Sequence, residues 1–301
     1  MPVYPSDIIL IQPETEKELV GSWAIRKRNF PDELHCDVPE KTLVLSLTGR
    51  DCALNCAHCG GHYLKGMTQP EELLEALSGG RYTSCLVSGG CASSGAVDGE
   101  NKAHMIANLK QRNLRINMHV GLMSPEELQL VAPLADRISF DFVTDDTTIE
   151  EVFGLHRTSQ DYIKTYNLLR KLGTPVLPHI CIGLKGGQVI GEYGALEKLA
   201  ELGADGLVFI VLIPTPGTRY QDKTPPPLDE VAQLLIRART LFPDIPLHLG
   251  CMRPKGRYRR ELDCLAVRCG LNKIVNPTPP SLKLARSMGL TLRHGKECCA
   301  L

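Results

Sequence analysis

Three cysteines lie close together after an apolar run, and their spacing suits metal chemistry. Cys52, Cys56 and Cys59 form a C-x3-C-x2-C pattern in one short loop. Three thiolates can hold three corners of an iron–sulfur cube, which in its closed form takes four cysteines. A corner without a protein ligand leaves one iron open to bind another molecule. The spacing predicts an open [4Fe-4S] site; the alternative is a structural zinc loop with His58 or His62 as the fourth ligand.

The stretch from Leu45 to Met67 resembles the signature of the radical S-adenosylmethionine (SAM) superfamily. The resemblance implies that the amine and carboxylate of SAM chelate the open iron. It also implies that reduction of the cluster cleaves SAM and yields a 5′-deoxyadenosyl radical. One position departs from the family pattern, because the residue before the third cysteine is usually aromatic and here is His58.

Composition excludes several classes of partner. The chain has 301 residues, with 34 lysines and arginines balanced by 34 aspartates and glutamates, so no charge favours nucleic acid or an anionic membrane. The longest apolar run, Leu207–Pro214, is too short to cross a bilayer. The N-terminal segment MPVYPSDIIL lacks the pattern of a secretory signal, which predicts a cytoplasmic protein. In that compartment the 12 cysteines are not expected to form disulfides.

Strand-like and helix-like runs alternate from Thr42 onward, a rhythm that indicates parallel strands joined by right-handed crossovers. Eight repeats predict an α/β fold, a closed (β/α)8 TIM-type barrel. The alternative is an open sheet or the partial six-stranded barrel of many radical SAM enzymes. The predicted strands are Thr42–Leu47, Ser84–Ser88, Arg115–Val120, Arg137–Val143, Pro175–Gly183, Gly206–Pro214, Pro246–Gly250 and Lys273–Asn276.

The barrel is expected to occupy residues 41–290. Residues 1–40 read as an N-terminal extension with one amphipathic piece near Glu14–Asn29, and residues 291–301 read as a cysteine-rich C-terminal tail. In such barrels the chemistry takes place at the carboxyl ends of the strands. The three-cysteine loop follows the first predicted strand, as that rule requires.

The family resemblance also implies a SAM pocket. Gly89 and Gly90, after the second strand, match the glycine pair whose carbonyls accept from the SAM amine. Asp141 stands where the family places a polar residue on the ribose. Arg157 resembles a barrel arginine that binds the carboxylate in biotin-synthase-like enzymes, and the glycine-rich segment around Gly183 resembles the adenine contact. A plain turn at the glycine pair and a solvated surface arginine are the alternatives.

The remaining cysteines suggest an auxiliary cluster. In biotin synthase such a cluster is held by three cysteines and an arginine inside the barrel. Here Cys181 and Arg253 match, Cys85 or Cys91 is open as a second cysteine, and the third predicted strand offers His119 instead. A second arrangement uses four other thiols, if the termini fold over the barrel mouth. These four are Cys36, Cys251, Cys298 and Cys299. The alternative is that Cys298 and Cys299 belong to a disordered end.

Sulfur insertion of the lipoyl or biotin synthase type is the expected reaction, and the chain resembles a subunit of the two-protein lipoyl synthase of archaea. A single-cluster lyase, rearrangement or methylation enzyme of cofactor maturation is the second hypothesis. A non-catalytic iron–sulfur partner subunit is the third. The expected partners are SAM, a small-molecule or carrier-protein-bound substrate, a ferredoxin or flavodoxin as electron donor, and a second radical SAM subunit.

Overall fold

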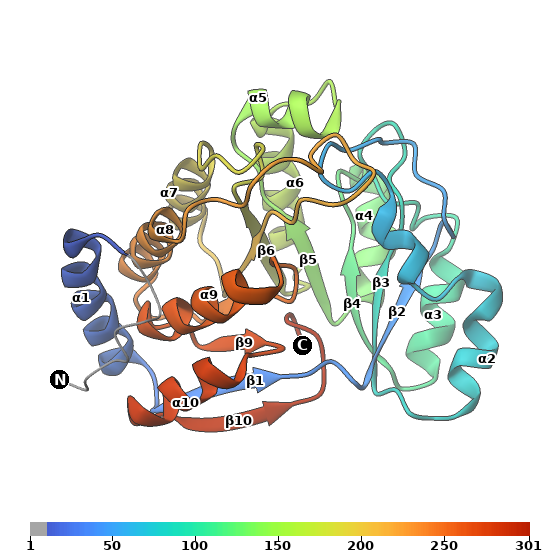
Figure 1. Ribbon diagram of the computed structural model, residues 1–301. Helices are drawn as coiled ribbons and strands as arrows, with labels where there is room; N and C mark the ends of the chain where they lie inside the picture. Colours follow the sequence, from blue (N-terminus) through green and yellow to red (C-terminus); the bar gives the residue numbers. More distant parts are fainter. Residues whose placement is uncertain (1–10) are drawn as a thin grey trace.

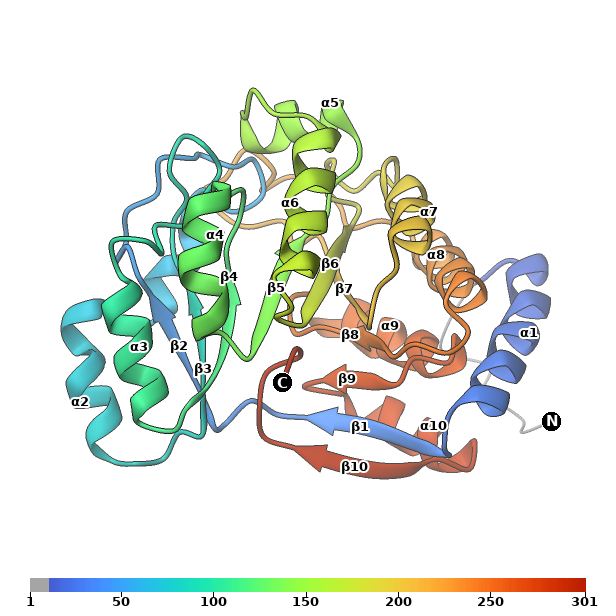
Figure 2. The ribbon, with the colours of Figure 1, turned by 180° about the vertical axis from the view of Figure 1, so that it is seen from behind.

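One parallel sheet organises the computed structural model, which describes residues 11–301. Within that range the sheet has ten strands in the order β10-β1-β9-β8-β7-β6-β5-β4-β3-β2. The strands are β1 (Glu33–Asp37), β2 (Thr42–Ser46), β3 (Ser84–Ser88), β4 (Arg115–His119), β5 (Arg137–Asp141), β6 (Val176–Ile182), β7 (Leu207–Val211), β8 (Leu247–Leu249), β9 (Lys273–Val275) and β10 (Thr291–Gly295). Figures 1 and 2 show that the sheet curls into a half-barrel with helices on its convex face.

The prediction of a closed eight-stranded barrel is wrong, and the alternative of a partial barrel is confirmed. Strands β2 and β10 are the two ends of the strand order, so the sheet stays open between them. The reason lies in β1, which pairs with β9 along one edge and with β10 along the other. Since both edges of β1 are occupied, β2 cannot pair with it even though it follows directly in the chain.

All eight predicted strands are present as β2 to β9, whereas the sequence analysis missed β1 and β10. Both missed strands are short and rich in polar residues, and both lie in segments interpreted as an extension and a tail. The predicted amphipathic piece near Glu14–Asn29 is helix α1 (Pro13–Asn29), which packs on α8 (Leu228–Leu241). The segment MPVYPSDIIL lies outside the described residues, and the boundaries at 40 and 290 remain predictions.

The helices follow the strands as connections, and several begin with the signals expected from the sequence. Helix α4 has Pro125 in its first turn and a capping box between Ser124 and Glu127. Besides α1 and α8, the α-helices are α2 (Leu73–Ser78), α3 (Ala103–Gln111), α4 (Pro125–Val131), α5 (Asp146–Thr148), α6 (Ser159–Lys171), α7 (Glu192–Leu202), α9 (Gly256–Arg268) and α10 (Pro279–Ser287). Within residues 11–301 no helix combines the length and apolar character needed to cross a membrane.

The two faces of the sheet differ in character. Apolar residues such as Ile116, Phe140 and Phe209 are fully buried in the core under the helices. Because successive residues of a strand point to opposite faces, the residues between them face the concave interior. Many of these interior residues are polar, for example Asn117 on β4 and His179 on β6, although both are buried. The half-barrel therefore has an apolar outer layer and a polar interior.

Candidate active site

The three-cysteine loop, here called the cluster loop (residues 48–61), follows β2 at the carboxyl edge of the sheet. Two other loops hold it through backbone contacts. The amide of Ala57 donates to the carbonyl of Val152 at 2.7 Å, and the amide of Tyr220 donates to the carbonyl of Ala57 at 2.9 Å. These two loops are also joined to each other, because the guanidinium of Arg219 donates to the carbonyl of Val152 at 3.4 Å. The loop is thus fixed by segments that follow β5 and β7.

The thiols of the cluster loop interact with one another. A hydrogen bond shared by Cys56 and Cys59 lowers the pKa of the Cys59 thiol and raises the pKa of the Cys56 thiol. The sulfur of Cys52 accepts from the backbone amide of Cys91 at 3.3 Å, and Cys52 also interacts electrostatically with Cys56. A thiolate is the form that binds metal, so this site favours one of its thiols in the ligand state.

The surroundings of His58 and His62 bear on the choice between an iron–sulfur cube and a zinc ion. A structural zinc site needs four ligands within about 2.3 Å of the metal. Among residues 11–301 no three His, Cys, Asp or Glu side chains are arranged to hold one ion. The ring of His58 packs edge-on against Phe153 with ring centres 5.9 Å apart, and the ring of His62 packs on Tyr63. The ring contacts of both histidines are thus with aromatic side chains, and an iron–sulfur cube remains the predicted occupant of the loop.

The glycine pair lies directly against the cluster loop. The amide of Gly90 donates to the hydroxyl of Thr48 at 2.7 Å. A side-chain carbon at Gly90 would lie 2.0 Å from the carbonyl oxygen of Asp51 and 2.6 Å from Cβ of Cys52. At Gly89 the corresponding contact is with the side chain of Thr48, at 3.2 Å. Only glycine allows the end of β3 to approach the cluster loop this closely.

Asp141 stands at the carboxyl end of β5, between the cluster loop and the concave interior. Its carboxylate interacts electrostatically with Cys59 and Cys91 at the rim, and with His119 and Cys181 on the neighbouring strands. These interactions bring residues from four strands or their following loops around one carboxylate. Asp141 therefore lies where the rim meets the concave interior.

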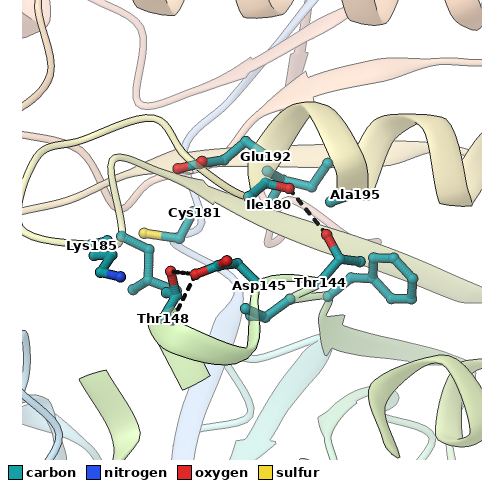
Figure 3. A pocket seen from close by; sticks show the side chains of 12 residues that line it. Thr144, Asp145, Thr148, Ile180, Cys181, Lys185, Glu192 and Ala195 are labelled. Carbon is teal, nitrogen blue, oxygen red and sulfur yellow. Dashed lines mark hydrogen bonds between the residues drawn. The ribbon is translucent and has the colours of Figure 1, made fainter. Parts of the chain in front are cut away.

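Gly183 ends β6 with a backbone φ of 74°, in the region that favours glycine. Its amide donates to the carboxylate of Glu192 at 2.7 Å, and the amide of Ile190 donates to the same side chain at 2.8 Å. Burial raises the pKa of Glu192. Figure 3 shows that Glu192, Cys181 and Lys185 line one small pocket beside this turn.

Arg157 lies apart from the other predicted residues. It precedes α6, its side chain is 41% exposed, and it forms an ion pair with Asp161 at 3.9 Å. Arg253 is also not a cavity residue, because it is fully buried in an ion pair with Asp263 at 2.7 Å. It donates in addition to the carbonyl of Gly250 at 2.6 Å. The role of Arg157 in binding the SAM carboxylate remains a prediction.

Histidines line the concave interior below the rim. The rings of His119 and His179 have centres 5.4 Å apart. Burial lowers the pKa of His179 to about 4 and that of His248 to about 3, so both are neutral near pH 7. His248 was not a predicted site residue, and its signal in the sequence is a polar residue between two leucines in a short strand.

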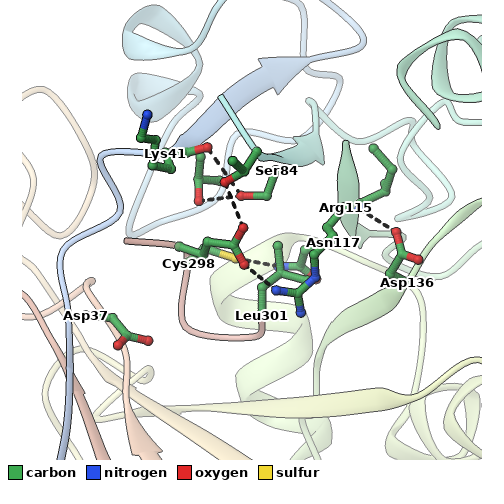
Figure 4. A network of polar contacts seen from close by, with 12 residues as sticks. Asp37, Lys41, Ser84, Arg115, Asn117, Asp136, Cys298 and Leu301 are labelled. Atoms are coloured by element: carbon green, nitrogen blue, oxygen red, sulfur yellow. Dashed lines mark hydrogen bonds and ion pairs between the residues drawn. The ribbon is translucent and has the colours of Figure 1, made fainter. Parts of the chain in front are cut away.

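The C-terminal tail (residues 296–301) turns from β10 into this interior and is anchored there. Figure 4 shows Cys298 against Asn117, whose amide donates to the sulfur at 3.5 Å. One ring nitrogen of His248 lies 3.0 Å from the carbonyl of Cys299, and Lys273 donates to the carbonyl of Leu301 at 3.2 Å. The alternative of a disordered end is therefore wrong, because side chains from three strands hold the tail.

The four thiols proposed for an auxiliary cluster do not converge. Cys36 is 1% exposed, and its sulfur interacts with Arg286 of α10, on the helix side of the sheet. Cys298 faces Asn117, as described above. Cys299 interacts electrostatically with both Cys298 and Cys251, so Cys36 is the thiol that stands apart. The cysteine count predicted a cluster that these positions do not support.

Comparisons with known proteins show which sequences and folds this chain resembles. No protein-family model matches the chain. The sequence is 22% identical to biotin synthase from Christiangramia forsetii over 249 residues, which is 77% of this chain and 66% of that protein. The structure superposes on methylornithine synthase (PylB) with a TM-score of 0.65 and 15% identity, covering 94% of this chain and 91% of that one.

The chain shares the fold of methylornithine synthase. The same fold is seen in the FeFe-hydrogenase maturase HydG from Carboxydothermus hydrogenoformans, with a TM-score of 0.69, 12% identity, and coverage of 94% of this chain and 73% of that one. Streptococcus suis SuiB bound to S-adenosylmethionine matches with a TM-score of 0.52 and 13% identity, over 87% of this chain and 62% of that one. The predicted resemblance to biotin-synthase-like radical SAM proteins is confirmed. The chain spans 66% of the length of its biotin synthase relative, just under two thirds.

Proposed function

We propose that this radical SAM protein is an enzyme that binds a [4Fe-4S] cluster on Cys52, Cys56 and Cys59 and SAM at the open corner of that cluster. When bound, the cluster would supply the electron that cleaves SAM into methionine and a 5′-deoxyadenosyl radical, which abstracts hydrogen from the substrate. One observation carries the proposal: Gly90 brings the end of β3 against the loop that holds the three thiols. The glycine backbone beside an open iron is where the SAM amine would be held.

The other predicted SAM residues suit the polar groups of the nucleotide. Asp141 projects beside the cluster loop and can accept hydrogen bonds from ribose hydroxyls. The turn at Gly183 is fixed by Glu192, so its backbone is preorganised to meet a flat ring such as adenine. Arg157 would have to leave its exposed partner Asp161 to reach a carboxylate. Such a bidentate contact would be stronger than the exposed pair it replaces.

Sulfur insertion into an unactivated carbon is the reaction we infer. The similarity to biotin synthase supports it, and so do the thiols of Cys181, Cys251 and Cys299 on the concave side. The dispersed auxiliary cysteines favour a second candidate, a single-cluster rearrangement, lyase or methylation reaction. In either case we propose a ferredoxin or flavodoxin as electron donor, and a second radical SAM subunit as partner for the carrier-bound substrate.

Anaerobic reconstitution tests the proposal. Full-length protein loaded with iron and sulfide should bind about four irons per chain, and addition of SAM and dithionite should release 5′-deoxyadenosine, measured by mass spectrometry. A Cys59→Ser variant should lose both signals, and a Cys264→Ser variant, altered on helix α9, should keep them. Cluster without any 5′-deoxyadenosine would instead support the non-catalytic partner subunit. Binding of zinc in place of iron would contradict both the radical enzyme and the iron–sulfur partner subunit.

A further inference from the structure

Cys299 is the tail thiol that faces the interior of the half-barrel, and it has a histidine partner. Its sulfur lies 3.8 Å from Nε2 of His179 on β6. The backbone carbonyl of the same residue lies 3.0 Å from Nδ1 of His248. Both the side chain and the main chain of Cys299 are therefore held by interior imidazoles. Such anchoring is unusual in the last few residues of a chain, which are commonly unordered.

The hydrogen bonds of His179 fix which ring nitrogen faces the thiol. Its Nδ1 lies 3.0 Å from the carbonyl oxygen of Leu177. A carbonyl can only accept a hydrogen bond, so Nδ1 carries the hydrogen and Nε2 presents its lone pair to Cys299. A nucleophile, a base and a third group that orients the base form the arrangement of an activated thiol. Burial raises the pKa of Cys299 and lowers that of His179, so the proton rests on sulfur until a reaction partner arrives.

A second opening reaches the tail from the side opposite to the cluster loop. A hollow of about 420 Å³ is lined by His35, His248, Lys273 and Leu301 among others, at the amino ends of β1, β8 and β9. The cluster loop lies at the carboxyl ends of the strands. The tail therefore lies between a hollow at the amino ends of the strands and the rim where the radical would form.

We propose that Cys299, with His179 as its base, carries sulfane sulfur as a persulfide and delivers it to the substrate radical. The proposal rests on sulfur insertion as the function. A persulfide on Cys299 would supply the sulfur that the predicted auxiliary cluster was expected to donate. Cys298 cannot replace Cys299, because its buried sulfur faces Asn117 on β4.

Sulfur is first loaded onto Cys299 and then delivered to the substrate radical. The Cys299 sulfur attacks the outer sulfur of a small persulfide or polysulfide; a new S–S bond forms and the S–S bond of the donor breaks. The thiol proton passes through Nε2 of His179 to the departing thiolate. A substrate carbon radical then bonds to the outer sulfur, and the S–S bond breaks homolytically. The substrate leaves as a thiol, and the Cys299 thiyl radical regains one electron from the low-potential donor that also reduces the cluster and one proton from water.

Persulfide mapping tests this step without any radical chemistry. Full-length protein is treated with limiting sodium tetrasulfide, cyanide-labile sulfur is measured as thiocyanate, and mass spectrometry locates a gain of about 32 Da in the C-terminal peptide after Lys296. Wild-type protein and Cys298→Ser should load on Cys299, and Cys299→Ser should not. His179→Gln keeps a polar side chain but lacks the base, so loading should slow by about 100-fold, the lower end for a general base.

Equal loading in wild type and Cys299→Ser, or in wild type and His179→Gln, would overturn the proposal. Thermal unfolding of each variant separates a local effect from misfolding, with Cys298→Ser as the matched control. Reductive cleavage of SAM is measured in parallel. Cys299→Ser should still form 5′-deoxyadenosine. A wild type that loads sulfur but forms no 5′-deoxyadenosine would refute the radical function and leave the sulfur site standing.

Discussion

The cluster loop and the C-terminal tail both present neighbouring cysteines, yet they use them in opposite ways. In the cluster loop Cys56 and Cys59 share a hydrogen bond, so thiols separated in sequence meet. In the tail Cys298 and Cys299 are adjacent, but their sulfurs contact β4 and β6 respectively. Adjacency along the chain thus says little about a common site, whereas spacing around a tight loop says a great deal.

The two regions are also held differently. Backbone amides and carbonyls of other loops fix the cluster loop, so its side chains are free to bind a cofactor. Side chains of the strands fix the tail, through Asn117, His248 and Lys273. Changes to the loop should therefore alter cofactor binding, and changes around the tail should alter stability and the interior. Four predictions test this contrast, from the largest effect to the smallest.

Replacing Cys56 with Ser should abolish the cluster. The remaining two thiols cannot hold a cube that already lacks a fourth protein ligand, so iron content and 5′-deoxyadenosine formation should both fall to background. Visible absorption after anaerobic reconstitution measures the effect. A Cys36→Ser variant is the matched control, because that thiol lies on the helix side of β1. Retained cluster in Cys56→Ser would show that the loop is not the binding site.

Gly90→Ala should disrupt the loop far more than Gly89→Ala. The new methyl group would overlap the carbonyl of Asp51 at Gly90, and backbone cannot move aside without displacing Cys52. We expect about 3 kcal/mol lower stability and loss of most 5′-deoxyadenosine formation. At Gly89 the added carbon would lie 3.2 Å from the hydroxyl of Thr48, a much milder contact than the one at Gly90, so the effect should be smaller. Equal behaviour of the two variants in denaturant unfolding and SAM cleavage would contradict the close approach.

Lys273→Met should destabilise the amino-terminal end of the half-barrel without changing cluster binding. Lys273 pairs with Asp37 at 2.9 Å, and Asp37 is only 5% exposed, so the variant leaves an unpaired buried carboxylate. Breaking such a pair costs about 3–5 kcal/mol, whereas removing both charges costs much less. Urea unfolding should show the loss in Lys273→Met and its recovery in the double variant with Asp37→Asn. Iron content should stay at the wild-type level in both.

Glu297→Gln should have the smallest effect. Its carboxylate accepts from the hydroxyl of Thr83 at 2.9 Å and pairs with Arg115, which is about half exposed. Solvent screens such pairs, so the expected loss is at most about 1 kcal/mol and should shrink further in high salt. Thermal unfolding at low and high ionic strength measures it. If Glu297→Gln lost as much stability as Lys273→Met, the exposed contacts of Glu297 would be the main anchor of the tail, rather than the contacts of its buried end.

Local patterns predicted the loop, while the tail depended on contacts that no local pattern reveals. The spacing of Cys52, Cys56 and Cys59 and the glycines after β3 are short-range signals, and eight strands were visible from their apolar runs. The strand β10 is polar and lies at a sheet edge, so nothing in its own sequence distinguishes it from a loop. Cys36 was misassigned for the same reason, because recognising β1 as a strand would have put it opposite to the interior.

The pairing of β1 with β10 has a consequence for biosynthesis. Glu33 and Arg293 bond across these strands although they are 260 positions apart in the sequence, so all the residues between them must be synthesised before this part of the sheet can form. Contacts of such high order are slow to form, and nascent chains fold from the N-terminus onward. The N-terminal helix and its strand must wait, exposed, while the intervening repeats assemble. Chaperone dependence during expression should therefore concentrate on the first forty residues, and truncating the last strand should leave them without a partner.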